Sequence, residues 1–259
     1  MFQRVFAENL VSIIKPDESI IGLAVGGSWI RNEMDKYSDL DLILVTKEKI
    51  SDDKNKMIAY AKGFGDFISG FTGEHVGEPR LLICLYDNPL LHVDIKFLTL
   101  PELSQRFEDP VVLFERENKL SSLIQSTKPA WPSIDFQWIE DRFWTWVHYT
   151  ASKIGRGEYF DVLTSLDYLR VKVLSRLLQF KNQTSATGVR KVEMKLSLPD
   201  LEDLKITVAQ YNKTSLIKSL ENTIAIYKSL RRKLFPGTIQ LQERAEKASL
   251  AYLKSIKNV

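Results

Sequence analysis

Two segments decide the fold: Gly26-Gly27-Ser28-Trp29-Ile30-Arg31 and, with ten residues between Ser28 and Asp39, Asp39-Leu40-Asp41-Leu42-Ile43-Leu44-Val45. The first segment follows the short apolar run 20–25, so it predicts a glycine turn that closes a strand and opens a short helix. The second segment predicts another strand. Because side chains two apart on a strand share a face, Asp39 and Asp41 present two carboxylates on one side of it.

The paired carboxylates and the glycine turn have complementary chemistry. Adjacent carboxylates repel each other unless a cation lies between them, and Mg²⁺ commonly binds one or two carboxylates together with substrate phosphates. A glycine turn lets backbone N–H groups approach a phosphate, and the start of a helix favours negative charge. Each feature alone is common in turns and on solvated surfaces. Their joint spacing predicts a nucleoside triphosphate site.

The order of Gly-Ser, short helix and Asp-x-Asp strand resembles the polymerase-β-like nucleotidyltransferase superfamily. The resemblance implies an enzyme of the α+β class, with a mixed sheet and helices in a catalytic N-terminal domain. It also implies a third carboxylate on a neighbouring strand, for which Asp94 is the candidate. Asp94 lies within the apolar alternating run 91–98, where a charge needs a reason. A salt bridge to Lys96, or exposure on a sheet edge, is the alternative interpretation.

By this resemblance the catalytic and metal-binding residues are Asp39, Asp41 and Asp94, which would hold one or two Mg²⁺ ions. ATP or another NTP would be the co-substrate. Gly27, Ser28 and Arg31 are the predicted nucleotide-binding residues of the first half.

The chain divides by pattern into two domains, 1–125 and 134–259, joined by the segment 126–133 with its two prolines. The first domain alternates helices and strands, and the second is helical throughout, as in an up-and-down bundle. Helices are predicted at 2–14, 52–65, 136–154, 159–180, 200–211, 215–234 and 239–256, strands at 20–25, 39–45, 81–86 and 91–98, and a loop at 181–192.

The second half resembles the helical domain of aminoglycoside and lincosamide antibiotic nucleotidyltransferases over Phe143–Tyr149 and Lys153–Phe160. The resemblance implies that Lys153 contacts the nucleotide phosphates, and Tyr149, on the same helical stripe, is a further predicted nucleotide-binding residue. The alternative is a stripe of core aromatics whose neighbouring cations extend to water.

Some relatives have a glutamate general base one turn before this lysine, where the present chain has Tyr149. The base would then come from Asp94, Glu140 or Glu158, or the reaction would proceed without one. His92 and His148 are further acid–base candidates, although both stand among apolar neighbours, where packed histidines are more common.

The implied acceptor is a hydroxyl of a small molecule such as an aminoglycoside or a lincosamide. An aminoglycoside would favour acidic groups such as Glu74 and Glu78, whereas a lincosamide would need apolar walls, for which the tryptophans at 138, 144 and 146 would serve. The resemblance also allows a homodimer. Alternatives are a nucleotidyltransferase of the toxin–antitoxin type, which modifies a partner protein, and a non-catalytic nucleotide sensor.

Composition and charge narrow the range of expected binding partners and compartments. Residues 1–125 hold 14 Lys and Arg against 20 Asp and Glu, a net charge of −6, and the remainder carries +9. The basic half lacks the continuous Lys and Arg tracts typical of nucleic-acid binding. The single cysteine, Cys84, is expected to be a small buried hydrophobe, and no apolar run has the ~20 residues of a membrane helix. We therefore expect a cytoplasmic protein without nucleic-acid or membrane partners.

Overall fold

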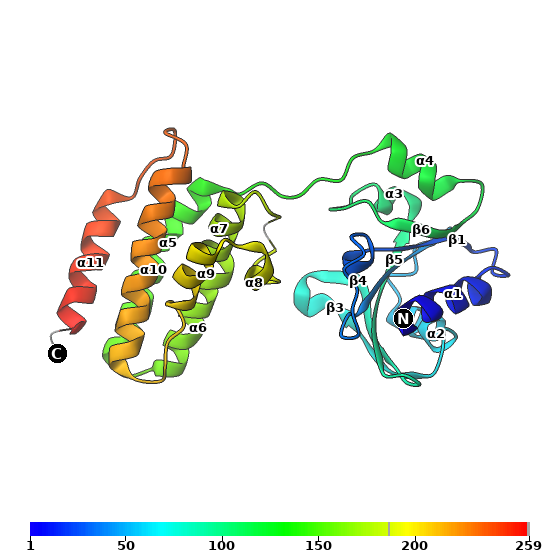
Figure 1. Cartoon of the computed structure of the whole chain (residues 1–259), viewed down its shortest axis with the longest axis horizontal. Coiled ribbons are helices and arrows are strands. Elements are labelled where there is room, and N and C mark those ends of the chain that lie inside the picture. The colour runs from blue at the N-terminus through cyan, green and yellow to red at the C-terminus, as the bar shows by residue number, and fades with distance from the viewer. Residues whose placement is uncertain (186, 258–259) are drawn as a thin grey trace. The chain divides into compact units, whose positions relative to one another are not determined.

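The computed structural model describes residues 1–185 and 187–257 and divides the chain into two compact units, Met1–Trp131 and Pro132–Val259. The fold is α+β: the first unit is built on a six-stranded mixed sheet, and the second is helical (Figure 1). The division between the units falls inside the proline-containing segment 126–133.

The first unit contains α1 (Phe2–Ile14), β1 (Ile20–Val25), η1 (Gly27–Trp29), β2 (Leu40–Thr46), α2 (Lys54–Lys62), β3 (Phe67–Gly73), η2 (Glu74–Val76), β4 (Glu78–Tyr86), β5 (Leu91–Thr99), α3 (Leu100–Leu103), β6 (Val111–Glu115) and α4 (Lys119–Ser126). The strand order is β3-β4-β5-β2-β1-β6. Strands β2 and β5 are parallel, and the other neighbours are antiparallel.

The two faces of the sheet are covered by different helices. Leu40, Leu42 and Leu44 of β2 belong to a core that also contains buried residues of α1 and α2. On the opposite face, Val45 packs in a smaller cluster with Leu103 of α3 and other residues, including one from α4. Because side chains alternate along a strand, Asp41 points to the same face as Val45, away from the α1 and α2 core.

The second unit contains α5 (Phe136–Arg156), α6 (Tyr159–Leu169), the π-helical turn η3 (Arg170–Leu174), α7 (Ser175–Lys181), α8 (Val192–Lys195), α9 (Leu198–Lys205), α10 (Lys213–Leu234) and α11 (Glu243–Lys257). Its core is formed by one large cluster of aliphatic and aromatic side chains, in which α5 packs against α6, α10 and α11.

Several predicted elements differ from the observed ones. The prediction lacked β3, β6 and α4. The predicted helix 159–180 is interrupted by the π-helical turn η3, in which Val173 and Leu174 are buried. The predicted helix 200–211 ends at Lys205, before a β-branched run at 206–208. The predicted loop 181–192 is rich in turns, and position 186 lies outside the described residues. Over the described part of the chain, no helix is long and apolar enough to cross a membrane.

Candidate nucleotide site

The sheet brings two of the predicted carboxylates side by side. Asp41 on β2 and Asp94 on β5 are Cα partners in the parallel ladder, so both side chains lie on the same face of neighbouring strands. Both residues are half-buried. His92, two residues before Asp94, is 51% exposed at its side chain, and its Nε2 lies 2.8 Å from Asp94 Oδ1. The expectation of a packed histidine at position 92 is therefore wrong.

The glycine turn presses directly against the Asp41 carboxylate. The Gly26 N–H donates to the Asp41 carbonyl oxygen at 2.9 Å, which continues the pairing of β1 with β2 beyond Val25. Gly27 has φ +62°, and an added Cβ would lie 1.9 Å from Asp41 Oδ2. Only glycine fits this position, because a side chain would be strained and would collide with the carboxylate. Ser28, the next residue, is buried within η1.

A residue that the sequence analysis did not single out, Glu108, completes this corner. Its Oε1 accepts a hydrogen bond from the Gly27 N–H at 3.0 Å. Its Oε2 lies 3.5 Å from Arg31 Nη1, and Arg31 also pairs with Glu33 at 3.5 Å. The structure thus places Gly27 against Asp41 and against the Glu108 carboxylate, which also contacts Arg31. No local sequence signal marks Glu108, because it is 81 residues from Gly27 and lies in a loop.

Arg106 holds the loop that carries Glu108. Its side chain is only 5% exposed and pairs with Asp109 at 2.6 Å. The guanidinium also donates to Thr127 Oγ1 at 2.6 Å and to the carbonyl oxygens of Ile124 and Thr127, both at 2.9 Å. A buried guanidinium needs partners for its N–H donors, and these bonds provide them. They also link the backbone beside Glu108 to the end of α4.

Asp39, the third predicted ligand, directly precedes β2 and is half-buried. Among residues 1–185 and 187–257, no three His, Cys, Asp or Glu side chains are grouped as a metal site. The structure places Asp41 and Asp94 in register on neighbouring strands, and the role of Asp39, Asp41 and Asp94 as metal ligands stays a prediction.

Lys153 and Tyr149 lie on α5 of the second unit, and their side chains meet two acidic residues. Lys153 Nζ bonds to Glu158 and lies 2.9 Å from Asp161 Oδ2, which also accepts from the Tyr149 hydroxyl at 2.8 Å. The hydrogen bond from Lys153 to Glu158 is the largest cause, and that to Asp161 the next, of a pKa of Lys153 above its usual value. These contacts favour the charged form of Lys153, and the role of Lys153 and Tyr149 with a nucleotide stays a prediction.

Two of the suggested general bases are engaged elsewhere. Glu140 is fully buried and accepts hydrogen bonds from Tyr227, from Arg231 Nη1 at 3.0 Å and from the Gln242 N–H at 3.0 Å. A carboxylate so enclosed cannot reach a substrate, so the suggestion of Glu140 is wrong. Glu158 pairs with Lys153. Asp94 is the suggested base that lies at the candidate site.

Two of the residues suggested to contact the acceptor are engaged in other contacts in the structure. Trp144 is buried in the helical core and donates to Glu140 at 3.3 Å, so it is not available as a pocket wall. Glu78 is bound by Arg80 at 2.7 Å and by Lys96 at 2.6 Å. Burial alone would raise the pKa of Glu78, but the hydrogen bonds from Arg80 and Lys96 outweigh burial and lower it to about 2.

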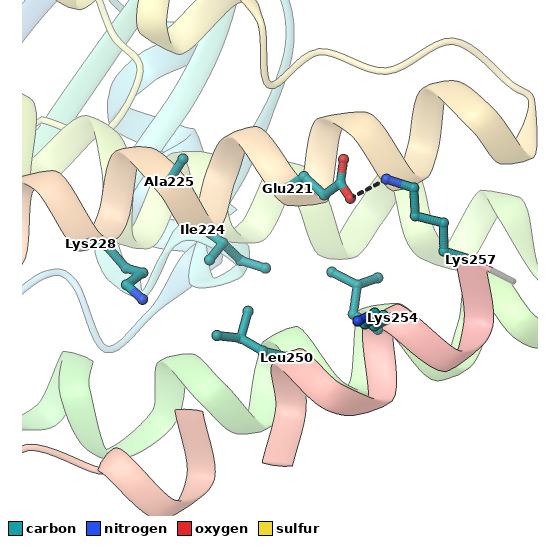
Figure 2. Close-up of a pocket in the computed structure, with 8 residues that line it drawn as sticks. Glu221, Ile224, Ala225, Lys228, Leu250, Lys254 and Lys257 are labelled. Carbon is teal, nitrogen blue, oxygen red and sulfur yellow. Dashed lines mark hydrogen bonds and ion pairs between the residues drawn. The ribbon is translucent and has the colours of Figure 1, made fainter. Parts of the chain in front are cut away.

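A separate pocket of about 620 Å³ lies in the second unit between α10 and α11 (Figure 2). Its apolar walls come from Ile224, Leu250 and neighbouring aliphatic residues, with lysines around them. Lys257 at its edge pairs with Glu221 at 2.8 Å. The pocket contains none of the residues that the sequence predicts for catalysis.

Comparisons with known proteins find similarity at the level of structure. No family model matches the chain, and neither does any curated protein sequence. A crystal structure of an aminoglycoside 6-adenyltransferase from Bacillus subtilis is similar over 98% of each chain, with 16% identity and a TM-score of 0.42.

Two further solved structures resemble the chain over nearly its whole length. A nucleotidyltransferase-like protein from Exiguobacterium sibiricum matches 99% of this chain and 89% of its own, with 12% identity and a TM-score of 0.38. A spectinomycin adenyltransferase from Enterococcus faecialis, solved with ATP and spectinomycin, matches 99% and 98%, with 13% identity and a TM-score of 0.29. At these scores the functional argument depends on the site residues of this chain.

Proposed function

We propose that this protein is a metal-dependent nucleotidyltransferase that transfers a nucleoside monophosphate, AMP from ATP in the first instance, to a hydroxyl of a small molecule such as an aminoglycoside or a lincosamide. The observation that carries the proposal is the corner formed by Asp41, Asp94 and Gly27. Two carboxylates in register on parallel strands lie beside the Gly27 turn, whose backbone N–H donates a hydrogen bond to a carboxylate in this structure. This pairing of anionic and N–H groups suits a metal-bound triphosphate.

The donor set fits Mg²⁺. Asp41 and Asp94 would provide hard oxygen ligands, with Asp39 as the further candidate and phosphate oxygens filling the remaining positions. Gly27 has no Cβ to collide with Asp41 Oδ2, so the carboxylate keeps its position beside the turn. When bound, Mg²⁺ would neutralise phosphate charge and so favour attack at the α-phosphorus.

The chain's own residues would orient the nucleotide. The Gly27 N–H and the Ser28 hydroxyl would hold phosphate oxygens, and the Arg31 guanidinium would stabilise charge on the leaving pyrophosphate. The acceptor oxygen forms a bond to the α-phosphorus while the bond from that phosphorus to the bridging oxygen breaks. The electron pair leaves with pyrophosphate, and the hydroxyl proton of the acceptor would pass to Asp94, the suggested base at this site, or to water.

Pyrophosphate release tests this proposal. The purified protein is incubated with Mg²⁺, each of ATP, GTP, CTP and UTP, and a panel of aminoglycosides and lincosamides. We expect release with at least one pair, and a loss of about 100-fold or more in Asp41→Asn and Asp94→Asn. Asp52→Asn is the matched control, because Asp52 is 71% exposed and its described ion pair is with Lys49, three residues before it.

The outcomes separate the alternatives. Equal turnover by Asp41→Asn and the wild type would refute the proposed site. Nucleotide binding without pyrophosphate release across the panel would favour a partner protein as acceptor or a nucleotide sensor.

A further inference from the structure

We propose that Glu108 is a built-in competitor of the nucleotide: its carboxylate occupies the anion position at the Gly27 N–H and is displaced when a triphosphate binds. The inference rests on the proposed function, because it assumes that this N–H is a phosphate contact. It adds a residue that sets nucleotide affinity from outside the metal-binding pair.

The contacts of Glu108 are those that a phosphate group would make. One carboxylate oxygen accepts from the Gly27 N–H at 3.0 Å, and the other lies 3.5 Å from Arg31 Nη1. Backbone N–H groups and guanidinium groups are the donors that proteins use for phosphate oxygens. Because each donor direction holds one acceptor, Glu108 and a phosphate cannot occupy the same position on Gly27.

The site is also crowded with like charge. An added Cβ on Gly26 would lie 3.7 Å from Glu108 Oε1 and 3.8 Å from Asp41 Cβ, so both acidic side chains border the same small turn. A triphosphate that arrived with Glu108 in place would meet the repulsion of a nearby carboxylate, which the partly buried setting screens only weakly.

The loop allows the side chain to move while its backbone stays in place. Arg106 fastens the backbone at 106–109 through partly buried hydrogen bonds. The Glu108 side chain itself is 35% exposed, and its contact to the half-exposed Arg31 is long at 3.5 Å. Rotation of the Glu108 side chain toward solvent would release the Gly27 N–H and Arg31 without unfolding the loop.

Glu108→Gln separates charge from shape. The amide oxygen of the glutamine can still accept from the Gly27 N–H, but the negative charge is gone. We expect the dissociation constant of Mg²⁺-tripolyphosphate, measured by isothermal titration calorimetry, to fall about tenfold in this variant, which corresponds to about 1.4 kcal/mol. The dissociation constant of Mg²⁺-ATP should fall to a similar degree.

Glu33→Gln is the matched control. Glu33 also contacts Arg31 at 3.5 Å, so this substitution removes the same charge beside the same guanidinium but leaves the hydrogen bond from Gly27 to Glu108 intact. We expect a change in the tripolyphosphate dissociation constant of less than about threefold. An equal gain in both variants would show a general charge effect and overturn the inference.

The inference and the proposed function fail in different ways. Unchanged or weaker tripolyphosphate binding by Glu108→Gln, with Asp41-dependent pyrophosphate release intact, overturns the role of Glu108 alone. Tighter tripolyphosphate binding by Glu108→Gln without any nucleotidyl transfer supports the competitor role and contradicts the proposed function. No binding of tripolyphosphate by the wild type or by any variant overturns both.

Discussion

Gly27→Ala probes the corner where the glycine turn meets Asp41. The substitution places a Cβ 1.9 Å from Asp41 Oδ2 and 2.9 Å from Asp41 Cγ, whereas ordinary contacts begin near 3.4 Å. The carboxylate must therefore move by about 1.5 Å. The left-handed backbone, φ +62°, adds a cost of about 1–2 kcal/mol for any residue with a Cβ.

The two effects appear in different measurements. Urea denaturation should show a loss of about 1–2 kcal/mol in the free energy of unfolding. Displacement of the proposed metal-binding carboxylate by more than 1 Å should lower pyrophosphate release about 100-fold or more. The same displacement should also weaken the affinity for the nucleotide.

Gly77→Ala is the control for backbone strain. Gly77 has φ +78°, and an added Cβ would have no atom within 4 Å. It should lose a similar free energy of unfolding while keeping the activity of the wild type. If Gly27→Ala retains activity and nucleotide affinity as Gly77→Ala does, the argument that the glycine protects the position of Asp41 is refuted.

Three further predictions concern the first unit. Arg106→Met should lower the free energy of unfolding by about 3 kcal/mol in urea denaturation, because several partly buried acceptors lose a charged donor; a loss below about 1 kcal/mol would contradict this role. The pKa of Glu78 is about 2 when folded, below its usual 4.5, so its stabilising effect is full above about pH 4.5 and disappears as the pH falls toward 2. Glu78→Gln should therefore make the urea midpoint depend less steeply on pH over that range. An unchanged dependence on pH would contradict the stabilising role of Glu78. Burial raises the pKa of Cys84 to about 12, so its thiol should resist a disulfide reagent at pH 8 until urea unfolds the protein, and rapid reaction of the native protein would disprove this.

The central strands could be predicted because they are short apolar runs bounded by turn residues. Gly26-Gly27 ends the 20–25 run, and Asp39 directly precedes β2. Asp87-Asn88-Pro89 separates β4 from β5. The edge strands were missed for the opposite reason. β3 contains two glycines and exposes much of its length, and β6 is short and follows Pro110, so neither has a strong apolar period.

The candidate site divides in the same way. The pair Asp39 and Asp41 and the glycine turn form a local pattern, so their proximity follows from strand geometry. The register of Asp41 with Asp94 depends on a parallel pairing across 53 positions, and the family resemblance rather than periodicity pointed to it. Glu108 reaches Gly27 through tertiary contacts of a loop, which no periodicity encodes.

The central claim is that Asp41 and Asp94 hold a divalent metal together with a nucleotide triphosphate. The most direct measurement is electron paramagnetic resonance of Mn²⁺, used in place of Mg²⁺, titrated with protein and a non-hydrolysable ATP analogue. In the presence of the analogue, we expect wild-type protein to lower the signal of free Mn²⁺ further than the analogue lowers it alone. Without the analogue, the protein should not lower the signal. Asp41→Asn should abolish the additional fall. Equal binding of Mn²⁺ by Asp41→Asn and wild type would contradict the account.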